Sequence, residues 1–403
     1  MIAILKKLVK SLSSNVVGVM DIGDYTTSGF IYELSSKDGT YKILGSAKVL
    51  SLGFENGQVI DIHKATHTFA TLLDEAEKIA NCRIKNVILS SAVAASKFMI
   101  YPYFTTLNKR VDEQDISEIV NIKSIQNILK KNDFVISLRN HLMYLDDKKI
   151  DYPLGLYAKT LKADVAISMS SQIAVSNLVK ILDYLSLELL ALIYPPVALP
   201  YFFDNRGASE IYLDIDLNKT IIIITQKTQS HYVNISKLGL HSILSQVALK
   251  LGIDLEIFLD FYLHDNSLLN LKGKIMEITM GNKIHKINYD DLHEALDKAL
   301  ENFLTAIKST YSHVKLQGDE KINISGLGSK ILSLNENFVK QINIAAVKKQ
   351  IKIEKQGFSE VSLEDVRAIS IMKYYLANSS KLYNSKKDIG LQTFKNRIKA
   401  IAS

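Results

Sequence analysis

The sequence predicts an α/β fold with two lobes, on the basis of its length, its alternating pattern and a repeated turn. A chain of 403 residues is too long for one ordinary hydrophobic core and indicates several subdomains. Short apolar runs of strand length alternate with amphipathic segments of helical period. The order strand, acidic turn, strand occurs around Asp21 and again around Asp214, so each copy opens one half of the chain.

The first half begins with a buried strand, because the apolar run Val16–Ile22 is closed by Gly23. The pattern then predicts strands at Gly29–Leu34, Tyr41–Val49 and Val87–Ser90, and a helix at His63–Ala80.

The stretch from about residue 91 to 160 differs in character, with short mixed strands and a turn at Pro153–Gly155. A charged helix is predicted near Glu113–Leu129. Farther on, an apolar stripe predicts an amphipathic helix between the strands Ala163–Met169 and Leu189–Tyr194. The stripe consists of Leu178, Ile181, Leu182 and Leu185.

The second half repeats the opening pattern, with a turn at Asp216–Lys219 between the strands Ile211–Ile215 and Ile221–Thr225. Helices are predicted at Leu240–Leu251, Leu255–Leu263 and Tyr289–Tyr311, and a further strand at Lys321–Ser325.

The composition is that of a globular chain, with 47% hydrophobic and 23% charged residues. Cys82 is the only cysteine, so no internal disulfide can form, which fits a reducing cytoplasm. The net charge of +7 permits contact with an anionic surface. Basic and aromatic residues are not interleaved as in a nucleic-acid groove, so no nucleic-acid partner is expected.

Membrane-spanning segments and metal sites are not predicted. The most apolar stretch, Tyr184–Phe203, contains Glu188 and three prolines and cannot run as one helix across a bilayer. His63 and His67 have the spacing of a helical metal pair, but no third ligand accompanies them.

The repeated acidic turn matches the way in which actin-fold ATPases hold a nucleotide. Backbone N–H groups of small residues cradle the phosphates there, and the aspartates position magnesium and water. A lone D-x-G after a strand is common, so each turn taken alone is better explained by Asp21 or Asp214 capping a turn.

Other segments, taken with these turns, resemble FtsA, an actin-like family of bacterial division proteins. Ser51–Asp61 (SLGFENGQVID) resembles the FtsA pattern after the first hairpin, and Lys321–Ser329 (KINISGLGS) looks like its adenosine turn. Asp115–Val120 and Pro153–Leu156 occupy the places of the FtsA-specific subdomain 1C, and Ala163–Tyr194 resembles the unit that follows it. The resemblance covers about residues 15–376 and depends on the order of these segments.

The resemblance implies a two-lobed actin-like (ribonuclease H-like) fold with an SHS2-like 1C insertion in the first lobe. It implies subdomain 1A at 14–83 and 163–205, 1C at 84–162, 2A at 206–240 and 320–377, and 2B at 241–319. An N-terminal amphipathic helix at 1–13, a linker at 378–390 and a C-terminal amphipathic helix at 391–403 are expected around these subdomains.

The resemblance also implies a nucleotide site, which departs from the family pattern. The first turn keeps Asp21 and Gly23 but has Asp24 and Tyr25 where small residues are usual. The second turn, Asp214–Ile221, lacks all three family glycines. The carried-over site residues are Asp21, Gly23, Asp24, Tyr25, Asp214, Asp216, Asn218, Glu256, Gly326, Leu327, Gly328 and Ser329.

Two interpretations of this site follow. Either ATP or ADP with magnesium still binds, weakly or with altered geometry, or the site is a structural relic. A β-carbon blocks the close approach of backbone N–H groups to phosphate, which favours the relic. In the helix that retains Glu256, Leu259 also replaces the family's lysine. No catalytic residue is assigned, and efficient ATP hydrolysis is not expected.

The C-terminal segment has the pattern of a short membrane-binding helix after a polar linker. Leu391, Phe394, Ile398 and Ile401 share one stripe, and Lys395, Arg397 and Lys399 lie off it. Insertion of the apolar face and attraction to anionic lipid would both contribute to binding. The alternative is a helix docked on the protein's own body.

The N-terminal segment shows a similar pattern. Apolar residues lie on one side of a helical wheel and Lys6, Lys7 and Lys10 lie opposite. We predict a second membrane-contacting helix, or alternatively one packed on the body or on a partner. The apolar residues are Ile2, Ile4, Leu5, Leu8, Val9 and Leu12.

The function implied by the resemblance is to tether filaments of the tubulin-like protein FtsZ to the cytoplasmic face of the inner membrane at the division site. Subdomain 2B would hold the FtsZ C-terminal tail, and 1C would serve self-association and the recruitment of later division proteins. One alternative is a PilM-type pilus-assembly protein, against which the C-terminal helix argues. Another is a sugar-kinase-like enzyme, against which the altered turn at Leu217–Asn218 argues.

Overall fold

The computed structural model describes residues 16–35, 40–90, 96–203, 210–226, 229–264, 275–280, 283–314, 321–332, 342–343, 350–353, 357–360 and 365–384. The chain divides into two compact units. Unit 1 comprises Met1–Ser209, Ile223–Val233 and Lys348–Ser403, and unit 2 comprises Glu210–Ile222 and Asn234–Val347.

Unit 1 is organised around a seven-stranded sheet in the order β11-β6-β1-β2-β3-β19-β20. β1, β2 and β3 are antiparallel neighbours, whereas β6 runs parallel to both β1 and β11. β1 is buried along almost its whole length, as expected for a largely apolar run at the centre of a sheet. The strands are β1 (Val16–Ile22), β2 (Thr26–Leu34), β3 (Tyr41–Leu50), β6 (Asn86–Ser90), β11 (Glu188–Ile193), β19 (Gln350–Ile353) and β20 (Gly357–Glu360).

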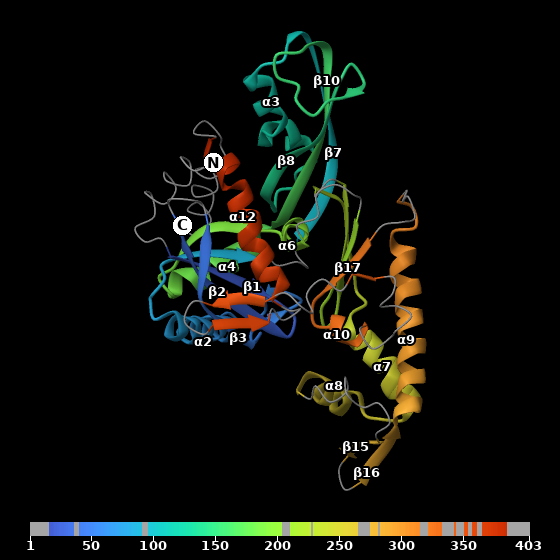
Figure 1. Ribbon diagram of the computed structural model, residues 1–403. Coiled ribbons are helices and arrows are strands. Elements are labelled where there is room, and N and C mark those ends of the chain that lie inside the picture. The colour runs from blue at the N-terminus through green and yellow to red at the C-terminus, as the bar shows by residue number, and fades with distance from the viewer. Residues whose placement is uncertain are drawn as a thin grey trace. The chain divides into compact units, whose positions relative to one another are not determined.

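Helices cover both faces of this sheet. α2 (Ile62–Ala80) and α4 (Gln172–Tyr184) pack their apolar sides into one core, to which Phe69 and Leu178 belong. Figure 1 shows α2 on one side of the sheet and α12 (Val366–Asn384) on the other. The hairpin β4 (Phe54–Glu55) and β5 (Gln58–Val59) precedes α2, and the short helices α5 (Pro195–Ala198) and α6 (Pro200–Phe203) follow β11 and contact α12.

The start of α2 shows how a single polar residue fixes a helix boundary. The Asp61 carboxylate accepts hydrogen bonds from the backbone N–H groups of Lys64 and His63. These bonds stabilise the charged form and lower the pKa of Asp61. The helix therefore begins directly after the motif Ser51–Asp61.

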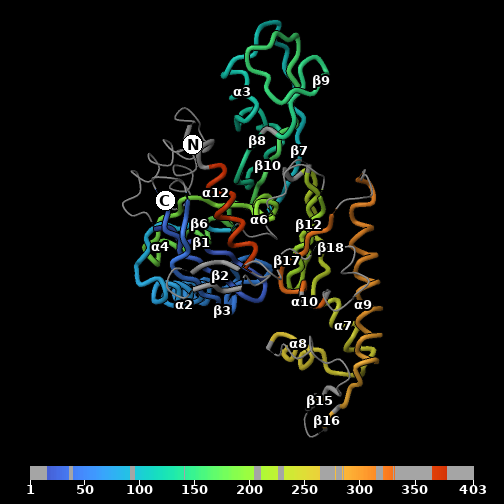
Figure 2. Tube along the Cα trace, viewed as in Figure 1, coloured from blue at the N-terminus to red at the C-terminus, as the bar shows by residue number. Residues whose placement is uncertain are grey.

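A second, four-stranded sheet in unit 1 has the order β7-β10-β8-β9 and its own core. It lies mostly in the stretch 91–160, but β10 runs on to Ser171 and includes the strand predicted at Ala163–Met169. Figure 2 traces its long strands. The strands are β7 (Ser96–Arg110), β8 (Asp133–Leu145), β9 (Lys148–Lys149) and β10 (Tyr157–Ser171).

The single helix predicted at Glu113–Leu129 is wrong. The structure has the α-helix α3 (Glu113–Ile119) and the 3-10 helix η2 (Ile122–Ile128). The break has a local cause, because the Asn121 side chain accepts a hydrogen bond from the N–H of Lys123 and starts a new turn.

The strands of the second half form a five-stranded sheet in the order β14-β13-β12-β17-β18, with β12 parallel to β17. In unit 2, α7 (Leu240–Leu251) and α9 (Tyr289–Thr310) pack together, and α8 (Leu255–His264) also contacts α7. The remaining elements are β12 (Glu210–Ile215), β13 (Thr220–Gln226), β14 (Gln229–Ser236), β15 (Ile275–Met280), β16 (Lys283–Asn288), β17 (Lys321–Ser325), α10 (Ser329–Leu332) and β18 (Ile342–Asn343).

The structure corrects the predicted start of the C-terminal linker, and the two predicted terminal helices are not among the residues that it describes. α12 continues through Asn384, beyond the expected start of the linker at 378, because this polar stretch contains no glycine or proline to end a helix. The predicted helices at 1–13 and 391–403, with the membrane residues Leu391 to Ile401, lie outside the described residues. Within the described ranges, none of the helices has the length and apolar character needed to cross a bilayer.

Candidate functional site

The acidic turn of unit 1 joins β1 to β2 and places Asp21 near the end of the strand. The turn closes on itself, because the N–H of Gly23 donates to the carbonyl of Thr26 over 3.0 Å. Ser90 at the end of β6 accepts from the N–H of Ile22 over 3.0 Å. The Ser51 hydroxyl donates to the carbonyl of Gly23 over 2.9 Å. The backbone of this turn is therefore fixed by the protein's own groups.

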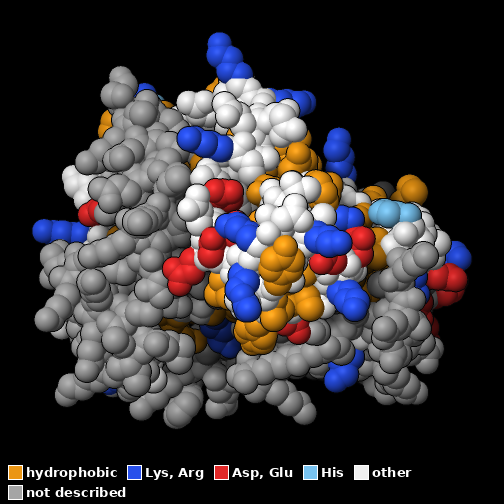
Figure 3. Space-filling model, turned by 90° about the horizontal axis from the view of Figure 1, so that it is seen from above, with side chains coloured by type: hydrophobic (Ala, Val, Ile, Leu, Met, Phe, Trp, Pro, Cys, Tyr) orange, Lys and Arg blue, Asp and Glu red, His pale blue; other side chains and the backbone are white. Residues whose placement is uncertain are grey.

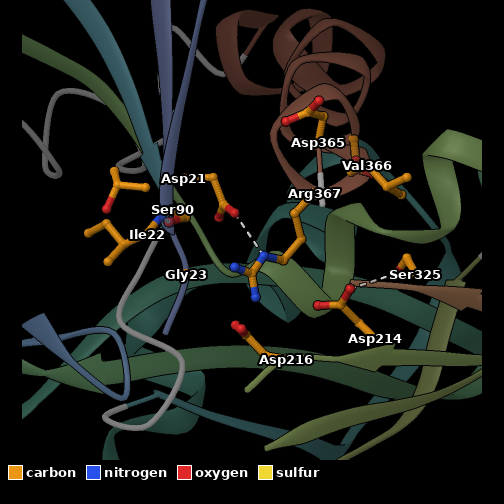
Figure 4. A network of polar contacts seen from close by, with 12 residues as sticks. Asp21, Ile22, Gly23, Ser90, Asp214, Asp216, Ser325, Asp365, Val366 and Arg367 are labelled. Carbon is orange, nitrogen blue, oxygen red and sulfur yellow. Dashed lines mark hydrogen bonds and ion pairs between the residues drawn. The ribbon is translucent and has the colours of Figure 1, made fainter. Parts of the chain in front are cut away.

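The Asp21 carboxylate forms an ion pair with Arg367 in the first turn of α12. The arginine Nε lies 2.7 Å from Oδ2, and the two side chains are only 8% and 3% exposed. Figure 4 shows the guanidinium pointing toward Asp21. The contact joins residues that are 346 positions apart in the sequence.

Two further features surround this ion pair. The second carboxylate oxygen of Asp21, Oδ1, is buried and has no hydrogen-bond partner among the described residues. A β-carbon at Gly23 would lie 2.5 Å from the Thr26 carbonyl oxygen and 3.0 Å from Nη2 of Arg367. The absence of a side chain at position 23 thus gives room to the guanidinium.

The acidic turn of unit 2 joins β12 to β13 and is also closed by its own hydrogen bonds. Asp214 is buried, and its Oδ1 accepts from the Ser325 hydroxyl of β17 over 2.6 Å, as Figure 4 shows. The N–H of Asp216 donates to the Lys219 carbonyl over 2.9 Å. Asn218 lies exposed in the turn, whereas Lys219 is buried.

The N-terminus of α7 packs against this second turn. The N–H groups of Leu240 and His241 donate to the carbonyls of Asp216 and Leu217 over 3.0 and 2.9 Å. N–H groups at a helix N-terminus are the usual donors to a phosphate. Here the carbonyls of the turn itself accept these two bonds.

The predicted adenosine turn adjoins the end of β12. The N–H of Gly328 donates to the Ile215 carbonyl over 2.8 Å, and the N–H of Ser329 donates to the Gly326 carbonyl over 3.1 Å. The Tyr262 hydroxyl of α8 donates to the Leu327 carbonyl over 3.2 Å. Glu256 lies exposed in the first turn of α8.

Within each unit, the structure therefore brings some of the predicted residues together. Asp21, Gly23, Asp24 and Tyr25 share the turn of unit 1, with Asp24 and Tyr25 half-buried. In unit 2, the residues around Asp214 adjoin those of the adenosine turn. Arg367 lies outside every strand, helix and motif singled out in the sequence, whereas Ser90 and Ser325 lie in predicted segments and only their contacts with Ile22 and Asp214 are new.

The donor set of unit 1 does not fit a magnesium ion. Its carboxylate already has a permanently charged guanidinium beside it, and a divalent cation would meet electrostatic repulsion there. The described residues also contain no cluster of three or more His, Cys, Asp or Glu side chains arranged around a common point.

Comparison with known proteins identifies the class of fold to which the chain belongs. No protein-family model matches the chain. Among solved structures, it is similar to the PilM-PilN type IV pilus biogenesis complex, with a TM-score of 0.58 and 14% identity over 90% of this chain and 98% of that one. It is also similar to the ethanolamine utilization protein EutJ from Carboxydothermus hydrogenoformans, with a TM-score of 0.51 and 11% identity over 93% and 99%. The fold is therefore actin-like, as the sequence predicted.

Within this class, the sequence matches point to FtsA. The chain is 21% identical to the cell division protein FtsA of Pseudomonas aeruginosa over 200 residues, which are 49% of this chain and 48% of the relative. It is 21% identical to FtsA of Rhizobium meliloti over 204 residues, 48% and 46% of the two chains. The chain thus spans about half the length of the curated relatives it matches, and the predicted resemblance to FtsA is confirmed as that of a divergent relative.

Proposed function

We propose that this protein acts as an FtsA-like division protein that tethers FtsZ filaments to the cytoplasmic face of the inner membrane. The observation that carries the proposal is the sequence similarity to FtsA from two bacteria. The four-stranded sheet of unit 1 supports it, because it occupies the place in the chain where FtsA has its 1C subdomain. The C-terminal amphipathic pattern supplies the membrane contact.

The FtsZ tail is assigned to the helices of unit 2 that correspond to subdomain 2B. Leu249 is 85% exposed and lies on α7, the helix that also packs against α8 and α9. An exposed aliphatic side chain on a helix is suited to anchor an apolar residue of a bound peptide.

Leu249→Asp is expected to weaken binding of a labelled FtsZ C-terminal tail peptide about tenfold, since a buried interface anchor contributes roughly 1–2 kcal/mol. Fluorescence anisotropy with the full chain measures the Kd. Ile173→Asp is the matched control, because Ile173 is 65% exposed and lies on helix α4 of unit 1. Equal affinities of the wild type and Leu249→Asp would remove this part of α7 from the binding site.

Self-association and recruitment are assigned to the four-stranded sheet of unit 1. Large apolar side chains are exposed on and around it, and Figure 3 shows hydrophobic side chains interspersed with Lys and Arg on the face seen from that end. Exposed apolar groups in such a setting are typical of protein contacts. The residues are Phe104, Tyr152, Leu154, Leu156 and Tyr157.

Membrane binding is assigned to the two ends of the chain. Removal of 390–403 is expected to reduce co-sedimentation with anionic vesicles, because each basic residue near the surface contributes about 1 kcal/mol in addition to apolar insertion. Removal of 1–13 as well is expected to reduce it further. Undiminished sedimentation of the chain lacking both ends would show that the contact lies elsewhere, and neutral vesicles serve as the control.

A PilM-type role in pilus assembly is the second candidate, and the similarity to the PilM-PilN complex favours it. The two roles differ in their partner. Binding of the FtsZ tail peptide supports the first role, whereas binding of PilN with no affinity for the tail peptide supports the second. Rapid ATP turnover that depends on a small substrate would instead indicate a kinase-like enzyme.

A further inference from the structure

We propose that Arg367 occupies the place of the magnesium ion in unit 1, so that this turn keeps its arrangement without a metal-bound nucleotide. The inference rests on the proposed FtsA-like function for the identity of the site, since it is the family that implies a magnesium nucleotide there. It concerns the Asp21 turn alone and is independent of how FtsZ is bound.

The charge of Arg367 matches the need of the Asp21 carboxylate. A buried carboxylate requires a counter-charge, and in an actin-fold ATPase a hydrated divalent cation supplies it. Here the guanidinium of Arg367 does so at 2.7 Å, with both side chains almost fully buried. An arginine side chain does not lose its proton in proteins, so the compensating charge is permanent.

The position of Arg367 in its helix also ties it to Asp21. Arg367 lies in the first turn of α12, where the helix dipole disfavours a positive charge. The Asp21 carboxylate offsets this cost. A second ion pair lies two residues earlier in the chain, where Oδ1 of Asp365 is 3.1 Å from Nζ of Lys48 on β3. Two ion pairs therefore hold the start of α12 on the sheet of unit 1.

The backbone N–H donors of the Asp21 turn are bonded within the protein. In a phosphate-binding turn, the N–H groups point toward the ligand. In this turn the N–H groups of Ile22 and Gly23 donate to Ser90 and to the Thr26 carbonyl. The glycine that the family uses for close approach of phosphate is retained, but the nearest side-chain atom to its missing β-carbon is Nη2 of Arg367 at 3.0 Å.

The experiment compares the thermal unfolding of the full-length wild-type chain in EDTA, in Mg²⁺, and in Mg²⁺ with ADP or AMP-PNP. A ligand present at about a hundred times its Kd would raise the Tm by several degrees. We expect the wild-type Tm to be the same in all conditions. A rise in Tm with magnesium nucleotide would overturn the inference, and loss of that rise in Arg367→Gln would identify the arginine as a phosphate ligand instead.

Variants test directly whether Arg367 stands in for Mg²⁺ beside the Asp21 carboxylate. Arg367→Gln frees the Asp21 carboxylate and is expected to have a higher Tm in Mg²⁺ than in EDTA, and Asp21→Asn/Arg367→Gln is expected to lose that dependence. Lys48→Gln is the matched control, since it removes the neighbouring ion pair and leaves Asp21 unchanged. An Arg367→Gln variant that folds and ignores Mg²⁺ would also overturn the inference. If Arg367→Gln does not fold, the wild-type measurements still decide.

The same preparations are tested for binding of the FtsZ tail peptide. A wild-type chain that binds the peptide and is stabilised by Mg·ADP contradicts the inference and leaves the proposed function intact. The opposite result separates the two ideas in the other direction. If the wild-type Tm is unchanged by Mg·ADP, the peptide does not bind, and Mg²⁺ raises the Tm of Arg367→Gln, then the proposed function is contradicted and the role of Arg367 is supported.

Discussion

An Arg367→Met variant is expected to unfold with a free energy about 3–5 kcal/mol smaller than that of the wild type, because it leaves the buried Asp21 carboxylate without its counter-charge. Methionine keeps the apolar stem and removes only the charged, hydrogen-bonding end. Urea denaturation followed by circular dichroism measures the difference, provided that the unfolding transition of unit 1 is resolved.

A second substitution and a control separate charge from packing. Asp21→Asn in the Arg367→Met background is expected to restore much of the loss, because the remaining side chain is neutral. Lys78→Met is the control, since Lys78 and its partner Asp74 are 71% and 51% exposed, and such pairs contribute only about 0–1 kcal/mol. Equal losses in Arg367→Met and Lys78→Met would contradict the importance given to the buried pair.

Gly53→Ala is expected to destabilise unit 1 by about 4 kcal/mol, which is large for one methyl group. Gly53 has a φ of +80°, and its β-carbon would lie 2.3 Å from the backbone N of Ala65 and 2.6 Å from the carbonyl oxygen of Asp61. Both contacts are with backbone atoms at the start of α2, so relief requires the helix to move.

Gly155→Ala is the matched control for this clash. Its φ is also +80°, but a β-carbon there would have no neighbour within 4 Å. Only the cost of the left-handed backbone remains, about 1–2 kcal/mol. The difference between the two variants in thermal or denaturant unfolding reports the clash at α2, and losses of the same size would show that the helix start adapts.

The fold could be predicted from the sequence where local signals are strong. The run before Gly23 is a buried strand, and α7 has the predicted limits because Gly252 ends it in a left-handed conformation. The break between α3 and η2 was missed, because it depends on a side chain, Asn121, that competes with the helix for a backbone N–H.

The candidate site could be predicted only in part. Asp21 and Asp214 were correctly placed at strand ends, because a short apolar run followed by an acidic turn is a local pattern. The partner of Asp21 could not be found in this way, because Arg367 is 346 residues away and nothing in its own neighbourhood distinguishes it from other helix arginines. Ser325 differs, since it belongs to the segment recognised as the adenosine turn, and only its contact with Asp214 was missed.

The ion pair between β1 and α12 has a consequence for biosynthesis. Unit 1 takes its first strand and its last described helix from opposite ends of the chain, whereas most of unit 2 is one continuous stretch, Asn234–Val347. During synthesis, unit 2 can therefore complete its contacts before Arg367, the partner of Asp21, has been made. A nascent chain that stops before residue 365 lacks α12, so in that chain the Asp21 carboxylate has no Arg367 to pair with.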